Sequence, residues 1–146
     1  MEYRKYGNIY ALRVDRGGEV MQALTELAER ENIRTAKIEG LGAADYLSVG
    51  LYDVEKQKFE VHEYREPLEI TSLIGSMTRM DKKPYLHVHI NAADADNRAI
   101  GGHLNAVRIS GTAELFVTVL DGEIGRKKDP AGTGLNIFDF GERKEK

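Results

Sequence analysis

The 146-residue chain has the size of a single folded domain. Its residues are 41% hydrophobic and 31% charged, a balance that is typical of a globular protein and excludes a disordered one. The formal net charge of -3 argues against nucleic-acid binding through bulk electrostatics, because phosphate neutralisation needs clustered Lys and Arg. The chain has no cysteine, so a disulfide is excluded and any metal must be held by imidazole or oxygen.

The first part of the chain predicts one strand followed by the single helix. Residues 1–14 lack the apolar core of a signal peptide, and no run approaches the roughly 18 apolar residues of a membrane span. We therefore expect a cytoplasmic protein without a membrane partner. Residues 9–14, IYALRV, alternate as a short strand does. A long helix is predicted over residues 18–31, with Glu19 in its first turn and with Val20, Ala23, Leu24, Leu27 and Ala28 at helical spacing.

The rest of the chain predicts six or seven strands, because the apolar period changes to two and β-branched residues become frequent. The expected fold class is α+β, with one domain over residues 1–140 that is mainly antiparallel sheet around one long helix. Residues 121–133 are interpreted as a loop, and residues 141–146 as a charged C-terminal tail. The predicted strands are RTAKIEGLGAA, DYLSVGLYD, QKFEVHEY, PLEITSLIGSM, YLHVHINAA and VRISGTAELFVTVL.

Three of the four histidines lie in residues 85–104, YLHVHINAADADNRAIGGHL. In a strand over residues 85–91, His87 and His89 point to one polar face while the alternate residues face the core. Two imidazoles at this spacing are roughly 6.6 Å apart along the strand and can both turn onto one ion. The DADN turn and the glycine pair before His103 allow the chain to return beside this row. We therefore expect a three-histidine metal site, with zinc as the first choice and a vacant fourth position.

Other interpretations of these residues stay open. A His-x-His pair on a strand is more often exposed or hydrogen-bonded than bound to metal, and imidazole also suits copper, iron and nickel. The DADN segment is interpreted as a turn and not as a calcium loop, because the further ligands of such a loop are missing.

Several other polar residues are weaker candidates. Glu69 lies in the apolar run LEITSLIG, where a carboxylate needs a partner, and it could hold an imidazole N–H. An exposed Glu at a strand edge is the more common case. Asn91 and Glu114 are candidates of the same kind, and His62 is interpreted as a surface residue. The glycines of GLGAADYLSVG follow the helix and lack the G-x-G-x-x-G order, and no G-x-S-x-G occurs, so neither a dinucleotide site nor a serine hydrolase is supported.

Ordered segments over nearly the whole chain carry a family resemblance: residues 10–53, 67–77, 84–104, 112–120 and 129–140. Together they resemble the PPC domain, the "plants and prokaryotes conserved" family, in its stand-alone prokaryotic form, which is related to the C-terminal domain of plant AT-hook proteins. The resemblance implies an α+β domain with an antiparallel sheet that assembles as a homotrimer. It also implies that the H-x-H and GGH set, present here as His87, His89 and His103, can hold a metal.

The function that follows has three versions. The plant relatives imply DNA binding or an association with transcription, but their AT-hook core, R-G-R-P, is missing, and the nearest string, GRKKDP at residues 125–130, is interpreted as a solvated loop. The histidines themselves suggest a small metal-dependent hydrolase or lyase that uses metal-bound water. A third interpretation is that they pack at the centre or seams of a trimer and fix its assembly. The sequence indicates no catalytic residue beyond them and no substrate.

Overall fold

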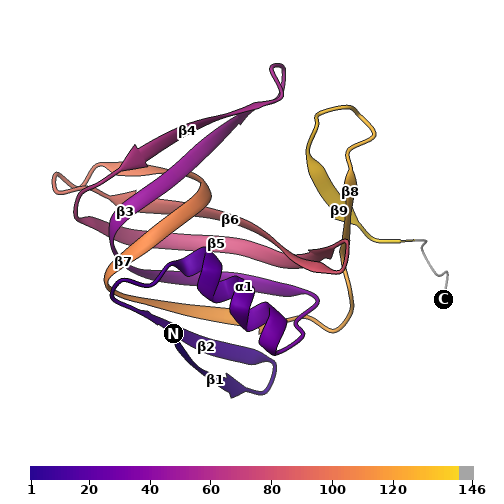
Figure 1. Cartoon of the computed structure of the whole chain (residues 1–146), viewed down its shortest axis with the longest axis horizontal. Helices are drawn as coiled ribbons and strands as arrows, with labels where there is room; N and C mark the ends of the chain where they lie inside the picture. The colour runs from indigo at the N-terminus through magenta and orange to yellow at the C-terminus, as the bar shows by residue number, and fades with distance from the viewer. Residues whose placement is uncertain (142–146) are drawn as a thin grey trace.

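Seven strands form one antiparallel sheet, in the order β1-β2-β7-β6-β5-β3-β4. The computed structural model describes residues 1–141 (Figure 1). Because β3 also pairs with β7, the sheet curls back on itself, and β8 and β9 form a separate ribbon beside it. This arrangement confirms a single α+β domain that is mainly antiparallel sheet. The elements are β1 (Glu2–Tyr6), β2 (Ile9–Asp15), α1 (Val20–Arg30), β3 (Ala36–Asp53), β4 (Lys58–Tyr64), β5 (Leu68–Met80), β6 (Lys83–Ala93), β7 (Ala99–Val119), β8 (Gly125–Lys128) and β9 (Asn136–Asp139).

The helix is shorter than the sequence suggests. A long helix over residues 18–31 is wrong, because α1 has 11 residues, Val20–Arg30. Glu19 is its N-cap and not a first-turn residue, since its carboxylate accepts hydrogen bonds from two amides of the first turn. At the other end, Asn32 has a φ of 49°, which turns the chain away. Within residues 1–141, no helix is long and apolar enough to cross a membrane.

Backbone contacts with β7 decide where α1 begins. The amide of Gly17 donates to the carbonyl of Ile109, and the amide of Ile109 donates to the carbonyl of Gly18, at 2.7 and 3.0 Å. The Glu19 carboxylate also accepts a hydrogen bond from the Val107 amide at 3.0 Å. These bonds hold the two glycines as an extension of the sheet, so the helix starts only after them.

One face of the sheet packs against α1 and the other stays open (Figure 1). Leu24 and Leu27 of α1 are fully buried in this contact. The opposite surface, which we call the outer face, carries Leu41, Ile74 and Phe116, whose side chains are 58%, 58% and 53% exposed. The single core expected from the chain length therefore lies entirely on the helix side.

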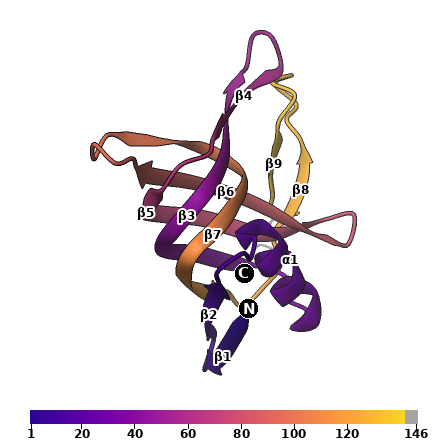
Figure 2. The ribbon, with the colours of Figure 1, turned by 60° about the vertical axis from the view of Figure 1, so that its left-hand side comes forward.

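Strand β1 was not predicted, and two further details differ from the predicted strands and loops. Residues 34–44 and 45–53, predicted as two strands, form the continuous strand β3, which bends through register shifts. Residues 121–133, predicted as a loop, contain β8, which pairs with β9 in a projecting hairpin (Figure 2). Residues 142–146 of the predicted tail lie outside the described residues, and the domain boundary at residue 140 stays a prediction.

Candidate metal centre

Strand β6 separates its side chains as its alternation predicts. Val88 and Ile90 are fully buried on the helix side of the sheet. His87 and His89 are exposed on the outer face. One strand therefore contributes two core residues and two imidazoles within four consecutive positions.

A tight hairpin brings His103 to the same place. The Asp94 carboxylate accepts hydrogen bonds from the amides of Asp96 and Arg98, at 2.9 Å each, which closes the turn between β6 and β7. In the antiparallel register that follows, His103 lies directly opposite His89. The prediction that the chain returns and places His103 beside His87 and His89 is thus confirmed. The glycine pair before His103, however, lies in strand β7 and not in the loop. Gly101 is needed there because a Cβ would collide with the β6 backbone.

The three imidazoles converge on one point. Their ring centroids are 5.1, 5.4 and 5.5 Å apart, and one nitrogen from each ring lies within 4.8 Å of the others. The Nε2 atoms of His87 and His89 are 3.2 Å apart. Two nitrogens on a tetrahedral zinc ion, each at about 2.0–2.1 Å, are separated by roughly 3.3 Å. The His87 and His89 rings are therefore spaced as two ligands of one metal are, although a hydrogen bond between two neutral tautomers would give a similar distance.

Electrostatics favours the neutral, metal-binding form of these rings. The pKa of His87 is lowered, first by loss of hydration and then by the positive charges that His103, His89 and Arg126 would place beside it. The pKa of His103 is lowered by the same loss of hydration and by His89. Because a metal binds only neutral imidazole, these shifts widen the pH range in which metal can bind.

An aromatic side chain forms one wall of the site. Phe59 of β4 lies 5.2 Å from His103, centroid to centroid, and 4.9 Å from Tyr52. Its ring packs against Gly50, where an added Cβ would lie 3.1 Å from the ring. Gly50 is itself the register partner of His103 across β3 and β7. The missing side chain at Gly50 therefore makes room for the apolar wall beside the third histidine.

Arg126 of β8 lies on the opposite side, and sequence analysis missed it. Its guanidinium donates hydrogen bonds to Ser76 Oγ, Thr78 Oγ1 and the Asn136 carbonyl, at 3.1, 2.9 and 3.1 Å. Ser76 is the register partner of His87. GRKKDP is thus not a solvated loop, because its arginine is half-buried against the sheet. The signal for it was the alternation of NIFDF after a turn-forming DPAGTG, which together predict a hairpin.

The weaker candidates lie farther along the sheet. Glu69 is exposed and pairs in register with Ala93, four residues beyond His89, and none of its hydrogen bonds within residues 1–141 reaches an imidazole. Asn91 is exposed and donates to Ser72 Oγ at 3.3 Å. Glu114 is exposed in β7, and His62 is exposed in β4, as expected for a surface residue. The roles suggested for Glu69 and Asn91 stay predictions.

Comparison with known proteins finds one family. The model of the Plants and Prokaryotes Conserved (PCC) domain matches residues 1–121. A candidate DNA-binding protein from Bacteroides thetaiotaomicron is 31% identical, with a TM-score of 0.92 over 95% of this chain and 96% of that one. A metal-containing protein from Archaeoglobus fulgidus is 35% identical, with a TM-score of 0.84 over 94% and 96% of the two chains. A PPC protein from Pyrococcus horikoshii is 26% identical, with a TM-score of 0.84 over 97% of each chain.

One curated relative is much longer. Over 131 residues, the chain is 31% identical to the bifunctional protein GlmU of Synechococcus, a match that covers 88% of this chain and 20% of that protein. The chain thus spans about a fifth of that relative's length. The family model, in contrast, extends from the first residue through β7 and includes all three histidines. The chain therefore belongs to the Plants and Prokaryotes Conserved domain family, as its sequence resemblance implied.

Proposed function

We propose that the protein is a homotrimeric PPC-domain protein that holds one zinc ion per chain through His87, His89 and His103. The observation that carries the proposal is the convergence of three imidazole nitrogens within 4.8 Å, two of them 3.2 Å apart. The lowered pKa values of His87 and His103 support it, because they favour the neutral ligand. The relative from Archaeoglobus fulgidus, which is metal-containing, supports a metal at this fold.

A three-nitrogen site leaves a fourth position for water or a ligand. Bound zinc would supply a Lewis acid there and would lower the pKa of a bound water. The chain's own contribution is to hold the rings: β6 fixes two of them and the register with β7 fixes the third. The Phe59 ring lies beside His103. This arrangement supports a small metal-dependent hydrolase or lyase as the catalytic version of the proposal.

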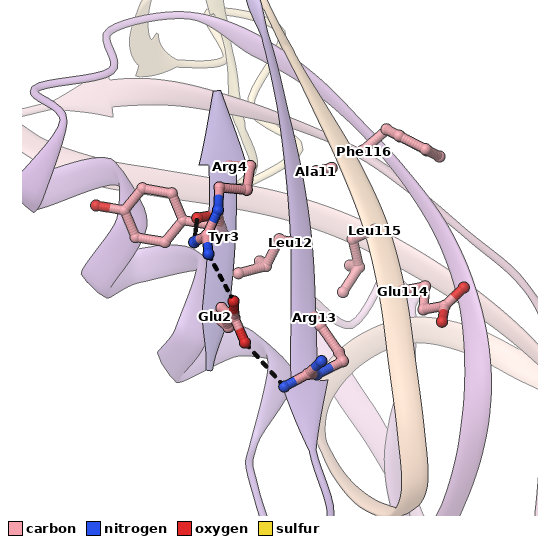
Figure 3. A pocket seen from close by; sticks show the side chains of 9 residues that line it. All are labelled: Glu2, Tyr3, Arg4, Ala11, Leu12, Arg13, Glu114, Leu115 and Phe116. Atoms are coloured by element: carbon pink, nitrogen blue, oxygen red, sulfur yellow. Dashed lines mark hydrogen bonds and ion pairs between the residues drawn. The ribbon is translucent and has the colours of Figure 1, made fainter. Parts of the chain in front are cut away.

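The outer face supports assembly. Glu39 of β3 pairs with Ile74 of β5 on one side and with Phe116 of β7 on the other, and Ile74 pairs with His89. Two exposed apolar side chains, on either side of Glu39, thus lie in the same register row as His89. Beyond Phe116 lies the pocket of Figure 3, where Glu2 pairs with Arg4 and Arg13 along its rim. Apolar side chains with a charged rim are the composition of a protein interface, and we assign this surface to contacts between copies of the chain.

Metal analysis tests the site. Protein purified without a nickel column should contain about one zinc per chain, and the His89→Ala variant should contain almost none. The matched control is His62→Ala, which removes an exposed histidine of β4 and should leave the metal content unchanged. Metal-free protein after exposure to zinc would overturn the proposal, and an anomalous-scattering map at the three rings would identify a different element.

Sedimentation tests the assembly. The unmodified protein should sediment as a trimer, and Phe116→Asp should shift it to monomer, because a carboxylate would be desolvated in the apolar contact. The matched control is Val54→Asp, a similarly exposed apolar residue in the turn between β3 and β4. A monomer at all concentrations for the unmodified chain would contradict the trimer and leave the metal site untouched.

DNA binding is the second candidate function. It is favoured by the 31% identical candidate DNA-binding protein from Bacteroides thetaiotaomicron. Two basic residues that could contact DNA are Lys127 and Lys128 of β8, of which Lys127 pairs with Asp139 at 3.2 Å. A gel-shift series should then show affinity that falls steeply with salt and with Lys128→Ala. Absence of a shift at moderate salt would remove this candidate.

A further inference from the structure

Arg126 is a partly buried cation whose partners are all neutral. Its guanidinium is 4.6 Å from the centre of the Tyr85 ring and 4.3 Å from that of Phe138. Its three hydrogen bonds go to two hydroxyl oxygens and one carbonyl oxygen. Within residues 1–141, no Asp or Glu forms an ion pair with it. Arg79 lacks one too, but its guanidinium donates to three backbone carbonyls, one of them that of Ala28 in the last turn of α1, where the helix dipole favours a cation. A desolvated positive charge without an anion is costly, so the absence points to a partner from outside the chain.

Its position relative to the histidines is fixed by the sheet. Arg126 stacks on Tyr85, which lies two residues before His87 on the same face of β6. That spacing is roughly 6.6 Å along a strand. Arg126 also donates to Ser76, the register partner of His87. The guanidinium is therefore a neighbour of the first imidazole and can meet a small molecule that also reaches the metal position.

The hydrogen-bonding capacity beside His87 is incompletely used. A guanidinium carries five N–H donors, and three hydrogen bonds are made here, so two donors remain available. The neighbouring Asn136 side chain donates to the Tyr85 hydroxyl at 3.3 Å, while its Oδ1 is buried without a partner. Unpaired buried polar atoms are uncommon in folded proteins. Unused guanidinium N–H groups and an unpaired amide oxygen thus lie together at the edge of the proposed metal centre.

We propose that Arg126 is the anion-recognition residue of this site, which takes a small ligand carrying a carboxylate or phosphate group. The inference rests on the proposed metal site, because three neutral imidazoles leave the charge of a bound divalent ion uncompensated. A planar guanidinium matches the oxygens of a carboxylate or phosphate in a fork geometry. The unpaired Asn136 Oδ1 is an acceptor and can take a hydrogen bond from a donor such as a hydroxyl on the same ligand. Phe59, whose ring lies beside His103, offers an apolar contact to the same ligand.

The test uses cobalt as the metal, since its visible absorption reports changes in its ligands. The full chain is loaded with cobalt and titrated with lactate, with lactamide as the neutral isostere, and with inorganic phosphate. Lactate should bind more tightly than lactamide. Arg126→Gln should weaken lactate at least tenfold and leave lactamide and the cobalt stoichiometry unchanged, because it removes a charged hydrogen-bonding group and no metal ligand. The phosphate titration decides which oxyanion the site prefers.

Arg30→Gln is the matched control, since it removes an exposed arginine of α1 and should not change lactate binding. Because Arg126 also holds β8 to the sheet, Arg126→Lys provides a second variant that keeps the charge without the fork and should lose lactate affinity severalfold. Equal losses for lactate and lactamide, or none, would overturn the inference while the proposed metal site stands. Failure of the unmodified chain to take up cobalt would overturn both.

Discussion

The two faces of the sheet are built from the same strands and do different things. On the helix side, Val88 and Ile90 of β6 are fully buried with Leu24 and Leu27 of α1. On the outer face, His87 and His89 of the same strand are exposed. The helix side has its apolar groups covered and its polar groups paired. The outer face has exposed apolar groups and converging imidazoles, which is the composition of a surface that binds something.

This contrast shows how a small domain separates stability from function. A strand presents alternate residues to opposite sides, so neighbouring residues of one strand can belong to the core and to the site. Substitutions on the two faces should therefore have separable effects. Helix-side variants should lose stability while the folded fraction keeps its site. Outer-face variants should keep the fold and lose binding.

The largest effect is expected for Leu24→Ala on the helix side. Truncating a fully buried leucine removes transfer free energy and leaves a cavity, which costs about 2–5 kcal/mol. The matched control is Leu51→Ala in β3, where the side chain is 67% exposed and the change should stay within about 0.5 kcal/mol. Urea denaturation of the metal-free proteins measures both. Equal losses for the two leucines would contradict the assignment of the core to the buried side chains that α1 covers.

The next effect concerns the metal. Zinc at 100 times its dissociation constant should stabilise the unmodified protein by about 2.7 kcal/mol. Loss of one ligand in His103→Gln should weaken zinc on the order of 100-fold, which leaves about 0.4 kcal/mol at the same concentration. Without zinc, the two proteins should unfold alike, because His103 is only partly buried. A zinc-dependent stabilisation that persists in the variant would place the metal elsewhere, and His62→Gln serves as the control.

A smaller effect tests how the helix is attached to the sheet. Glu19 caps α1 and also accepts the Val107 amide. Glu19→Ala should cost about 0.5–2 kcal/mol in urea denaturation, as loss of a helix cap does. Glu26→Ala, which removes a partly exposed glutamate of the same helix, is the control. If the two variants were equally stable, the bonds of Glu19 to the helix and to β7 would have no net effect.

The features that sequence predicted are those that depend on local pattern. Period-two alternation was sufficient to assign His87 and His89 to one face, and the Asx-type turn at Asp94 was sufficient to bring His103 back. The 3.6-residue period located the helix but not its start, because Gly18 is held by a backbone bond to Ile109, far away in sequence. A pattern of apolar residues carries no information about such a partner.

Features that depend on tertiary contacts were not predicted. The joining of two predicted strands into β3 results from its pairing with both β5 and β7, which no local window contains. The role of Arg126 depends on the docking of β8 against Ser76 and Thr78, and its basic neighbours in GRKKDP favoured a loop. Phe59 reaches His103 only because Gly50 leaves space between strands. The three ligands were thus predictable from one short segment, and the residues around them were not.

The smallest expected effect is a change in how the free energy of unfolding depends on pH. The slope of this dependence distinguishes outer-face variants from helix-side variants. Folding lowers the pKa of His87 through lost hydration and neighbouring positive charge, and that of His103 through lost hydration and His89. Just below the ordinary value of 6.5, the folded chain therefore binds fewer protons than the unfolded chain. The free energy of unfolding must then rise with pH through this window and level off above it. The contribution of the two histidines to the free energy of unfolding is fully present above pH 6.5 and is lost as the pH falls through their lowered folded pKa values.

Urea denaturation of metal-free protein between about pH 5 and 8 should show this slope. His87→Gln should reduce the slope, whereas Leu24→Ala should leave it unchanged. An unchanged slope in His87→Gln would mean that folding does not lower the pKa of His87, either through lost hydration or through the neighbouring positive charges.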